Sequence, residues 1–172
     1  MKHSQTKAGT KGWLNTFYPL FLIIIYITGV AFANTIHTNG INWHQWMHIF
    51  MAGFFLVFSA FKFLDLPGFA RTYATYDILA GRWPVYGYIY PFIELALGLA
   101  YAIAIAPTAI YLATIFIMGF SSLGVIKALR QKGKFRCACL GTILNLPMSS
   151  ITLIEDLLMV AMAAGMLIAR FC

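Results

Sequence analysis

Apolar residues gather into five long runs along the chain, separated by polar or charged stretches. A helix needs about 20 residues to cross the hydrocarbon core of a bilayer, and each run approaches that length. The third and fourth runs are divided only around Pro107, which predicts a tight helical hairpin because proline cannot continue a helix. The pattern predicts an all-α, polytopic membrane bundle, with residues 1–172 forming a single domain. The expected membrane-spanning helices lie at about 17–33, 46–64, 85–106, 108–126 and 151–171.

The composition favours a membrane protein over a soluble one. Of the 172 residues, 61% are hydrophobic and 10% are charged. An ordinary soluble domain carries about 25% charged residues. The chain therefore lacks the polar surface that a water-facing globule requires, and we expect membrane lipid to contact the outside of the bundle.

Positive charges lie at alternate ends of the apolar runs. A net charge of +7 would fit a nucleic-acid-binding protein if the basic residues formed one surface. Their alternation with apolar runs is instead typical of membrane insertion, so we expect no nucleic-acid partner. Eleven of the twelve Lys and Arg residues lie in three groups: Lys2, Lys7 and Lys11; Lys62, Arg71 and Arg82; and Lys127, Arg130, Lys132, Lys134 and Arg136.

These groups predict an orientation, because short cytoplasmic loops are enriched in Lys and Arg. Loop 34–45 contains no Lys or Arg, whereas loop 127–150 contains five. We therefore expect a multi-pass protein of the bacterial inner membrane, with its N-terminus in the cytoplasm and its C-terminus outside.

The first apolar run has a second interpretation. Its basic start and the sequence Ala31-Phe32-Ala33 resemble a cleavable signal peptide. We favour an uncleaved anchor, because both the polar leader and the apolar run are long for a signal. Cleavage would leave the orientation of the other helices unchanged.

Three acidic residues fall within apolar runs. Glu94 lies several residues inside the third run, and Glu155 and Asp156 lie near the start of the fifth. Such groups cost about 3 kcal/mol at membrane depth and usually face a bundle interior. For Glu94, a proton or cation relay and a hydrogen-bonded structural acid are hypotheses of equal weight. For Glu155 and Asp156 we favour an interfacial role with Lys or Arg of the neighbouring loop.

A stripe of His and Met begins the second run. His44, Met47, His48 and Met51 share one helix face, and imidazole with thioether suits Cu(I). We favour the alternative, in which the histidines are interfacial and the methionines pack. Packing is also the expected role of a second methionine stripe, which comprises Met159, Met162 and Met166.

Loop 65–84 mixes aromatic residues with Asp77, Arg71 and Arg82. Residues 70–79 are expected to form an amphipathic helix at the inner membrane interface, with Asp77 paired to Arg71 or Arg82. The alternative is a lipid-facing connector.

The sequence KFRCACLG places Cys137 and Cys139 in the basic loop before the fifth run. The neighbouring Lys134 and Arg136 favour thiolate, which is both a nucleophile and a soft-metal ligand. A disulfide across one intervening residue is strained and therefore reducible. Two thiolates also bind ions such as Cu(I). The alternative that we disfavour is a tight turn of small residues before Gly141.

Three motifs together resemble the MauE branch of the MauE/DoxX membrane proteins. They are FARTYATYDILAGRWPVYGYIYPFIELALGLAY, CACLG and LPMSSITLIEDLLM, and the resemblance covers about residues 46–170. It implies a redox-associated membrane protein that assists maturation of methylamine dehydrogenase, by export or disulfide formation of its small subunit. It also implies neighbours with thioredoxin-like or heavy-metal-associated domains. The residues that match the family's motif positions are Cys137, Cys139, Glu94, Glu155 and Asp156.

The leading hypothesis is therefore a thiol-redox accessory protein that uses Cys137, Cys139 and Glu94. It would exchange electrons with a thioredoxin-like partner, through a membrane quinone. The alternative is a transporter of a soft cation such as Cu(I). In that hypothesis His44, His48 and Met47, then Glu94, then the cysteine pair mark entry, midpoint and exit. A third hypothesis is a scaffold without chemistry.

The predicted orientation can be tested with the native cysteines. A membrane-impermeant maleimide added to cells stripped of the outer membrane should label Cys172, because it ends the chain on the outer side. It should not label Cys137 or Cys139. The reverse labelling pattern would invert the orientation.

Overall fold

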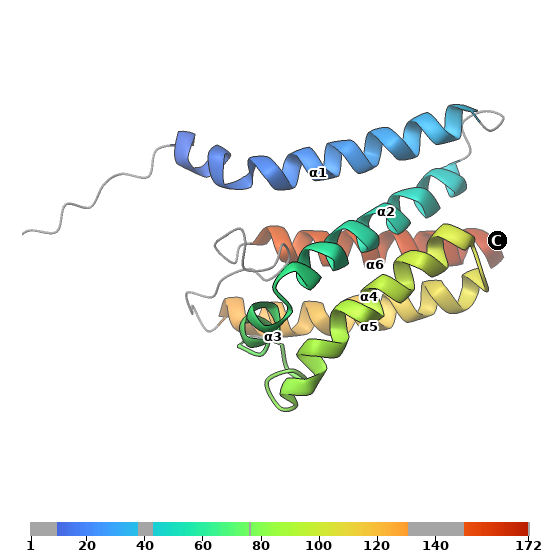
Figure 1. Cartoon of the computed structure of the whole chain (residues 1–172). Helices are drawn as coiled ribbons and strands as arrows, with labels where there is room; N and C mark the ends of the chain where they lie inside the picture. The colour runs from blue at the N-terminus through green and yellow to red at the C-terminus, as the bar shows by residue number, and fades with distance from the viewer. Residues whose placement is uncertain (1–9, 38–42, 76, 131–149, 172) are drawn as a thin grey trace, which may run out of the picture.

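The structure is a computed structural model that describes residues 10–37, 43–75, 77–130 and 150–171. Over these residues the chain forms helices and turns without a strand, so the expected all-α architecture is confirmed. The helices run back and forth along one direction, with a short helix at one end (Figure 1). They are α1 (Thr10–His37), α2 (Trp43–Leu64), α3 (Leu66–Tyr73), α4 (Pro84–Ile103), α5 (Pro107–Arg130) and α6 (Ser150–Phe171).

Long helices occupy all five of the expected apolar runs. Among the described residues, Trp43–Leu64, Pro84–Ile103 and Pro107–Lys127 are long and apolar enough to cross a membrane. Helix α1 contributes a shorter apolar stretch, Phe21–Thr35. Helix α6 has a similar length but carries acidic residues in its second turn. The architecture is that of a multi-pass membrane protein.

The helices pack as two pairs. Helix α2 lies mainly against α4, and α5 lies mainly against α6, while α4–α5 and α2–α6 contacts join the pairs. Large side chains are buried where the helices meet. Phe55 of α2 stacks on Tyr101 of α4 within one pair, and Tyr101 lies beside Tyr111 of α5 across the two pairs. The largest fully buried side chains include Tyr101, Tyr111, Phe55, Met51, Met118, Met159 and Met166.

Helix α1 forms a separate layer that contacts α2 and no other helix in the described part of the chain (Figure 1). Ile27, Ala31 and Thr35 are buried and recur at four-residue spacing, so they form the stripe that faces α2. Most other described α1 side chains are exposed, as expected for a helix surrounded by lipid.

The hairpin predicted around Pro107 lies just before it. Helix α4 ends at Ile103, and Ala104 and Ala106 have positive φ angles of 51° and 45°. Pro107 then begins α5, a position where its missing N–H costs no helical hydrogen bond. Non-glycine residues rarely adopt positive φ, so this turn is a strained part of the backbone.

The connection between α2 and α4 differs from the expected interfacial helix over 70–79. The helix is α3, and the Asp65 side chain caps it by accepting a hydrogen bond from Gly68 N–H at 3.0 Å. Its residues Phe69 and Tyr73 are buried, and α3 packs against α4. This segment is therefore part of the bundle and not a lipid-facing connector.

The predicted ion pair of Asp77 with Arg71 or Arg82 is wrong for the described residues. Asp77 Oδ1 accepts hydrogen bonds from the backbone N–H groups of Leu79 at 2.9 Å and Ala80 at 2.8 Å. The short carboxylate therefore satisfies the turn that follows α3, in the manner typical of Asp in turns.

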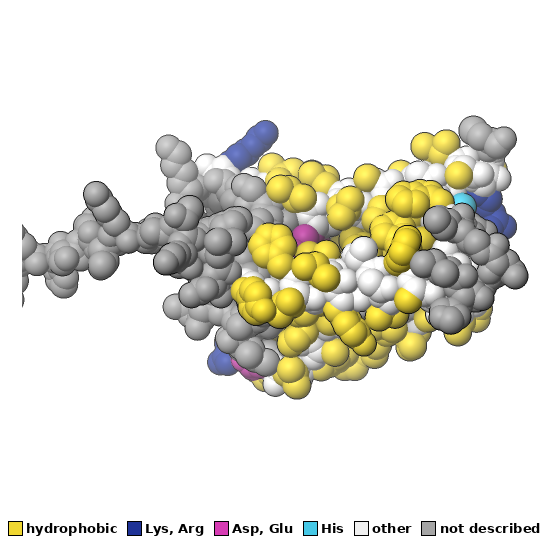
Figure 2. Space-filling model, turned by 90° about the horizontal axis from the view of Figure 1, so that it is seen from above, with side chains coloured by type: hydrophobic (Ala, Val, Ile, Leu, Met, Phe, Trp, Pro, Cys, Tyr) yellow, Lys and Arg dark blue, Asp and Glu magenta, His cyan; other side chains and the backbone are white. Residues whose placement is uncertain are grey.

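Charge and apolar surface are separated along the molecule. Hydrophobic side chains cover the middle of the face in Figure 2, and Lys and Arg side chains appear towards its two ends. This distribution fits a bundle whose middle lies in hydrocarbon.

Close packing of α2 on α4 depends on Gly98. A Cβ atom at this position would lie 3.0 Å from the backbone nitrogen of Leu56, which cannot move without shifting α2. Gly98→Leu should therefore lower the free energy of unfolding in detergent by about 1–3 kcal/mol. Gly119→Leu is the matched control, because nothing lies within 4 Å of a Cβ built there. Equal loss of stability in the two variants would contradict the packing described here.

Candidate functional site

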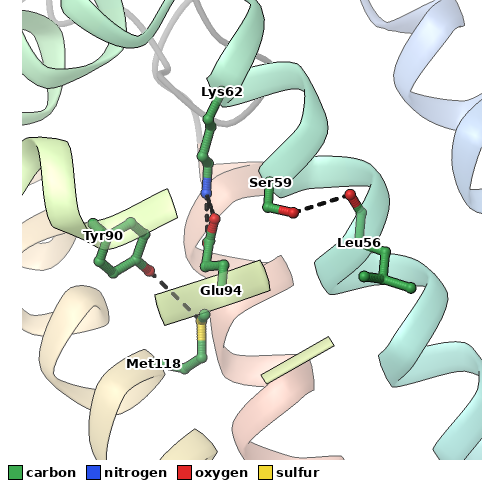
Figure 3. A network of polar contacts seen from close by, with 6 residues as sticks. All are labelled: Leu56, Ser59, Lys62, Tyr90, Glu94 and Met118. Atoms are coloured by element: carbon green, nitrogen blue, oxygen red, sulfur yellow. Dashed lines mark hydrogen bonds and ion pairs between the residues drawn. The ribbon is translucent and has the colours of Figure 1, made fainter. Parts of the chain in front are cut away.

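A buried ion pair joins α2 to α4. The Lys62 ammonium contacts both carboxylate oxygens of Glu94 (Figure 3). The two side chains are only 7% and 5% exposed. Glu94 lies ten residues after Pro84, about 15 Å along the helix at 1.5 Å per residue. The pair is therefore well inside the apolar part of the bundle.

Helix direction explains why these two side chains meet. Side chains on a helix tilt towards its N-terminus. Helices α2 and α4 run in opposite directions (Figure 1). Lys62 near the end of α2 therefore points towards the middle of the bundle, and Glu94 points back towards Lys62. A lysine near a helix end commonly extends to the membrane surface, but here the tilt and the carboxylate hold it inside.

Aromatic rings surround the ammonium group. Lys62 Nζ lies 5.3 Å from the ring centroid of Phe69 and 5.0 Å from that of Tyr90. A cation this close to a ring face is stabilised by the quadrupole of the ring. The Tyr90 hydroxyl donates to Met118 Sδ on α5 at 3.9 Å (Figure 3). The ion pair is thus enclosed by residues of α3, α4 and α5.

Two acids of α6 lie next to this pair. Asp156 interacts electrostatically with Lys62 and Glu94, and also interacts with the Ser121 hydroxyl of α5. Glu155 is 8% exposed and interacts with Asp156 and Lys62. Its Oε1 is buried and makes no hydrogen bond to the described residues.

One expectation about these acids stays a prediction. Glu155 and Asp156 were expected to pair with Lys or Arg of the neighbouring loop, whose residues 131–149 lie outside the described residues. In the described structure, the base near them is Lys62, which comes from a different helix. They belong to the bundle interior.

Together these residues form what we call the inner cluster: Lys62, Tyr90, Glu94, Ser121, Glu155 and Asp156. Among the residues that the structure describes, it holds three carboxyl groups and a single ammonium group. Full ionisation would leave excess negative charge in a poorly solvated place, which is costly. The cluster is therefore suited to binding protons or another cation, and it can change its charge by exchanging them.

A second polar group lies near the opposite end of the bundle. A hydrogen bond of 2.5 Å joins His48 Nε2 to the Tyr111 hydroxyl, and one of 3.0 Å joins the hydroxyls of Tyr101 and Thr114. The rings of His44 and His48 stack with centroids 5.8 Å apart. His44 and His48 also line a pocket with residues of α1 and α4.

The structure supports the packing role favoured for Met47 and Met51, and not the copper ligand set that was the alternative. Met47 is 7% exposed and belongs to the hydrophobic core, as does the fully buried Met51. Neither residue lines the pocket that contains His44 and His48. Among the described residues, no group of three or more His, Cys, Asp or Glu side chains is arranged to hold a metal ion. The α6 methionines pack as expected: Met159 and Met166 are buried in the core, and Met162 packs against it.

The predicted thiol residues lie outside the described residues. Cys137 and Cys139 fall within 131–149, and Cys172 follows the last described residue. The chain that carries the pair leaves α5 at Arg130 and enters α6 at Ser150. Glu155 and Asp156 follow Ser150 within two turns. The loop with the two cysteines therefore joins the bundle at the end where the inner cluster lies.

Comparison with protein families identifies the chain. The family described as methylamine utilisation protein MauE matches residues 42–169, which is well over half of the chain. The chain belongs to the MauE family. No curated protein and no solved structure matches it. The family match begins just before α2 and ends within α6, so both polar sites lie inside the MauE region and α1 lies before it.

Sequence reasoning missed the most important base of this MauE protein. Lys62 was grouped with the cytoplasmic charges because it ends an apolar run, yet it is buried against Glu94. One signal was available. Lys62 still lies inside its apolar run, and Glu94 lies inside another. Each charge needs a partner at a similar depth in the membrane, so the two could have been expected to pair. Tyr90, Tyr101, Tyr111 and Ser121 gave no such signal, because tyrosine and serine are common in membrane helices.

The ion pair predicts an asymmetric response to mutation. Lys62→Met removes the ammonium that compensates the carboxylates, so it should lower the free energy of unfolding in detergent by about 3–5 kcal/mol. Adding Glu94→Gln to that variant should restore more than half of the loss, because the buried charge is then removed. Thermal unfolding of the two variants and the wild type measures both effects. A double variant no more stable than Lys62→Met would show that the pair does not compensate charge.

Proposed function

We propose that this MauE protein is a thiol-redox accessory protein of the bacterial inner membrane. It acts with a thioredoxin-like partner in the maturation or disulfide handling of a client such as methylamine dehydrogenase. Cys137 and Cys139 exchange the electrons, and the inner cluster around Glu94 takes up and returns the accompanying protons.

The inner cluster is the observation that carries this proposal. A structural ion pair balances its charges. Within the described part of the chain, this cluster has more carboxyl groups than bases, and a buried carboxyl oxygen of Glu155 makes no hydrogen bond. Such a group is costly unless a proton or cation binds there at some stage. Intramembrane acids commonly form proton relays.

Thiol exchange provides a use for these protons. In the proposed reaction the partner, having passed its disulfide to the client, has two thiols. These become a disulfide again, and the disulfide between Cys137 and Cys139 becomes two thiols. Two electrons and two protons pass from the partner to the pair, so the exchange balances. Each attacking thiol must first lose its proton, and each leaving thiolate must regain one. The carboxylates of α6 are the acids closest along the chain to this loop that could hold those protons.

Soft-cation transport remains the second candidate. One observation favours it: polar side chains gather near both ends of the bundle, with His44 and His48 at one end and the carboxylates towards the other. A transported ion such as Cu(I) would use imidazole and thiolate as soft ligands. A heavy-metal-associated domain would then be the expected partner.

The relay hypothesis predicts a selective effect of Glu94→Gln. Glutamine keeps an oxygen that accepts a hydrogen bond from Lys62 but cannot exchange a proton, so the membrane level should be kept while activity falls at least about 100-fold. Activity is the initial rate at which the cell forms the disulfide-bonded client, at matched protein levels. Asp77→Asn is the matched control, because Asp77 is equally buried, at 3% against 4% exposed, and serves a turn. Full activity of Glu94→Gln would make Glu94 structural.

The cysteines are predicted to act as a unit. Cys137→Ser, Cys139→Ser and the double variant should lose the same amount of activity, because a single thiol can neither close a disulfide nor chelate an ion. The redox hypothesis further predicts that Cys139→Ser traps a mixed disulfide with a thioredoxin-like protein, detected on non-reducing gels. If the purified protein instead binds one Cu(I) per chain that protects both thiols from alkylation, transport replaces the redox hypothesis. A fully active double variant would contradict both.

A further inference from the structure

Glu155 differs from the other two acids of the inner cluster in what surrounds its carboxyl group. The residue is 8% exposed, so little solvent reaches it. Its Oε1 is buried and makes no hydrogen bond within the described part of the chain. Buried polar atoms are rarely left in this state, and an ionised carboxylate in this state is costlier than a neutral carboxyl group. The charge of Glu155 therefore needs to be cancelled.

The ammonium group of the inner cluster is already engaged by another acid. Lys62 contacts both carboxylate oxygens of Glu94. Its charge acts on Glu155 without a hydrogen bond or ion pair between the two side chains in the described structure. Asp156, the next residue of α6, carries the same sign as Glu155 and adds to the cost of ionising it. Lys62 therefore compensates Glu94 first, and Glu155 gains little from it.

The helices packed on α6 offer no other base to Glu155 among the described residues. Helix α6 packs mainly on α5 and also touches α2. The bases at this end of α5 are Lys127 and Arg130, and both are exposed. Within the described structure, the charges that act on Glu155 are those of Asp156 and Lys62. A negative charge on Glu155 would therefore remain without a direct partner.

Asp156 is better placed to stay ionised. The residue is only partly buried, and its carboxylate interacts with the Ser121 hydroxyl and with Lys62. A hydroxyl donor and a nearby ammonium group both stabilise a carboxylate. The three acids thus have unequal environments: Glu94 has a direct ion pair, Asp156 has a donor and partial exposure, and Glu155 has neither.

We propose that Glu155 is the proton-binding site of the inner cluster: its carboxyl group holds a proton in the resting protein, while Glu94 and Asp156 are ionised. A proton cancels the charge of Glu155 and makes its unpaired oxygen part of a neutral group. A proton also requires no coordination shell. Among the described residues, no group of three or more His, Cys, Asp or Glu side chains is arranged to supply one.

This inference rests on the proposed function for the use of the proton. A proton relay needs one group that starts protonated and another that starts ionised, and unequal environments assign those roles. Glu155 is the group that starts protonated, and Glu94, held by Lys62, starts ionised. In the proposed exchange the cysteine pair gains two protons and the partner loses two. A proton released by Glu155 to the pair is therefore replaced by one from the thiols of the partner.

The test detects the proton by infrared spectroscopy of the purified full-length protein, in a detergent without carbonyl groups. A protonated carboxyl group has a C=O stretch above the amide band, and this stretch moves to lower frequency in D₂O. Exposed carboxyl groups are ionised at pH 6, because their ordinary pKa values are about 4. The wild type should show the band at pH 6 and lose it reversibly as the pH rises.

Two variants and one label assign the band. Glu155→Gln should abolish it, because glutamine keeps the shape of the side chain but cannot bind this proton. Asp156→Asn is the matched control on the neighbouring residue and should keep the band. Glu94 and Glu155 are the two glutamates of the chain. Protein synthesised with glutamate that carries ¹³C in its side-chain carboxyl group should therefore show a shifted band.

Three results would overturn the proposal: a wild type without the band at pH 6, a Glu155→Gln variant that keeps it, or an Asp156→Asn variant that loses it as completely. A band that appears only after sodium and potassium ions are removed would also overturn it, because the site would then hold a metal cation. Should Glu155→Gln fail to fold, Glu155→Asp with labelled glutamate decides. A band that still shifts in this variant belongs to Glu94 and refutes the proposal, whereas the absence of a shifted band supports it.

The cysteine variants separate this inference from the proposed function. The Cys137→Ser, Cys139→Ser double variant should keep the band, because the proton on Glu155 does not depend on the thiols. If the band is present but the cysteine variants are fully active, the thiol reaction fails and the proton site stands. If the thiol reaction is confirmed but the band is absent, the proton site alone is wrong.

Discussion

The cost of placing charge in hydrocarbon is the constraint on which the arrangement of this bundle depends. An isolated Lys62 or Glu94 would be strongly unfavourable at this depth. Their pairing offsets the cost only if α2 and α4 lie close enough for direct contact, and Gly98 permits that approach. If the two helices moved apart, the pair would break and leave a buried charge without a partner. The ion pair therefore restricts the relative position of the two helices more strictly than apolar packing does.

The pair also draws other elements around it. Phe69 and Tyr90 cover the ammonium, which explains why α3 packs into the bundle instead of lying on its surface. The acids of α6 lie close enough to interact with Lys62, although α6 packs mainly on α5. One lysine thus links the two pairs of helices electrostatically, and a change of protonation at Asp156 would be felt by both Glu94 and Glu155.

The two polar sites lie on the same helices but are separated by an apolar layer. On α4, Glu94 and Tyr101 are seven residues apart, or about 10 Å. Ser121 and Thr114 have the same spacing on α5. Leu97 and Met118 lie between them and are buried. The bundle therefore holds two polar sites separated by a buried apolar layer, the acidic one towards its inner end and the His and Tyr one near its outer end.

Apolar periodicity and the distribution of Lys and Arg determined the helices, the hairpin before α5 and the predicted orientation, because these depend on residues close together along the chain. The same signals placed Glu94 inside the membrane. Only the tertiary structure showed that Lys62 is its partner, that Asp77 serves a turn, and that Met47 faces the core while His44 and His48 face a pocket. Each of these depends on which helices are neighbours and how they are rotated. The sequence of a single helix does not contain that information, because a polar residue has the same local pattern whether it faces a partner, a pocket or a turn.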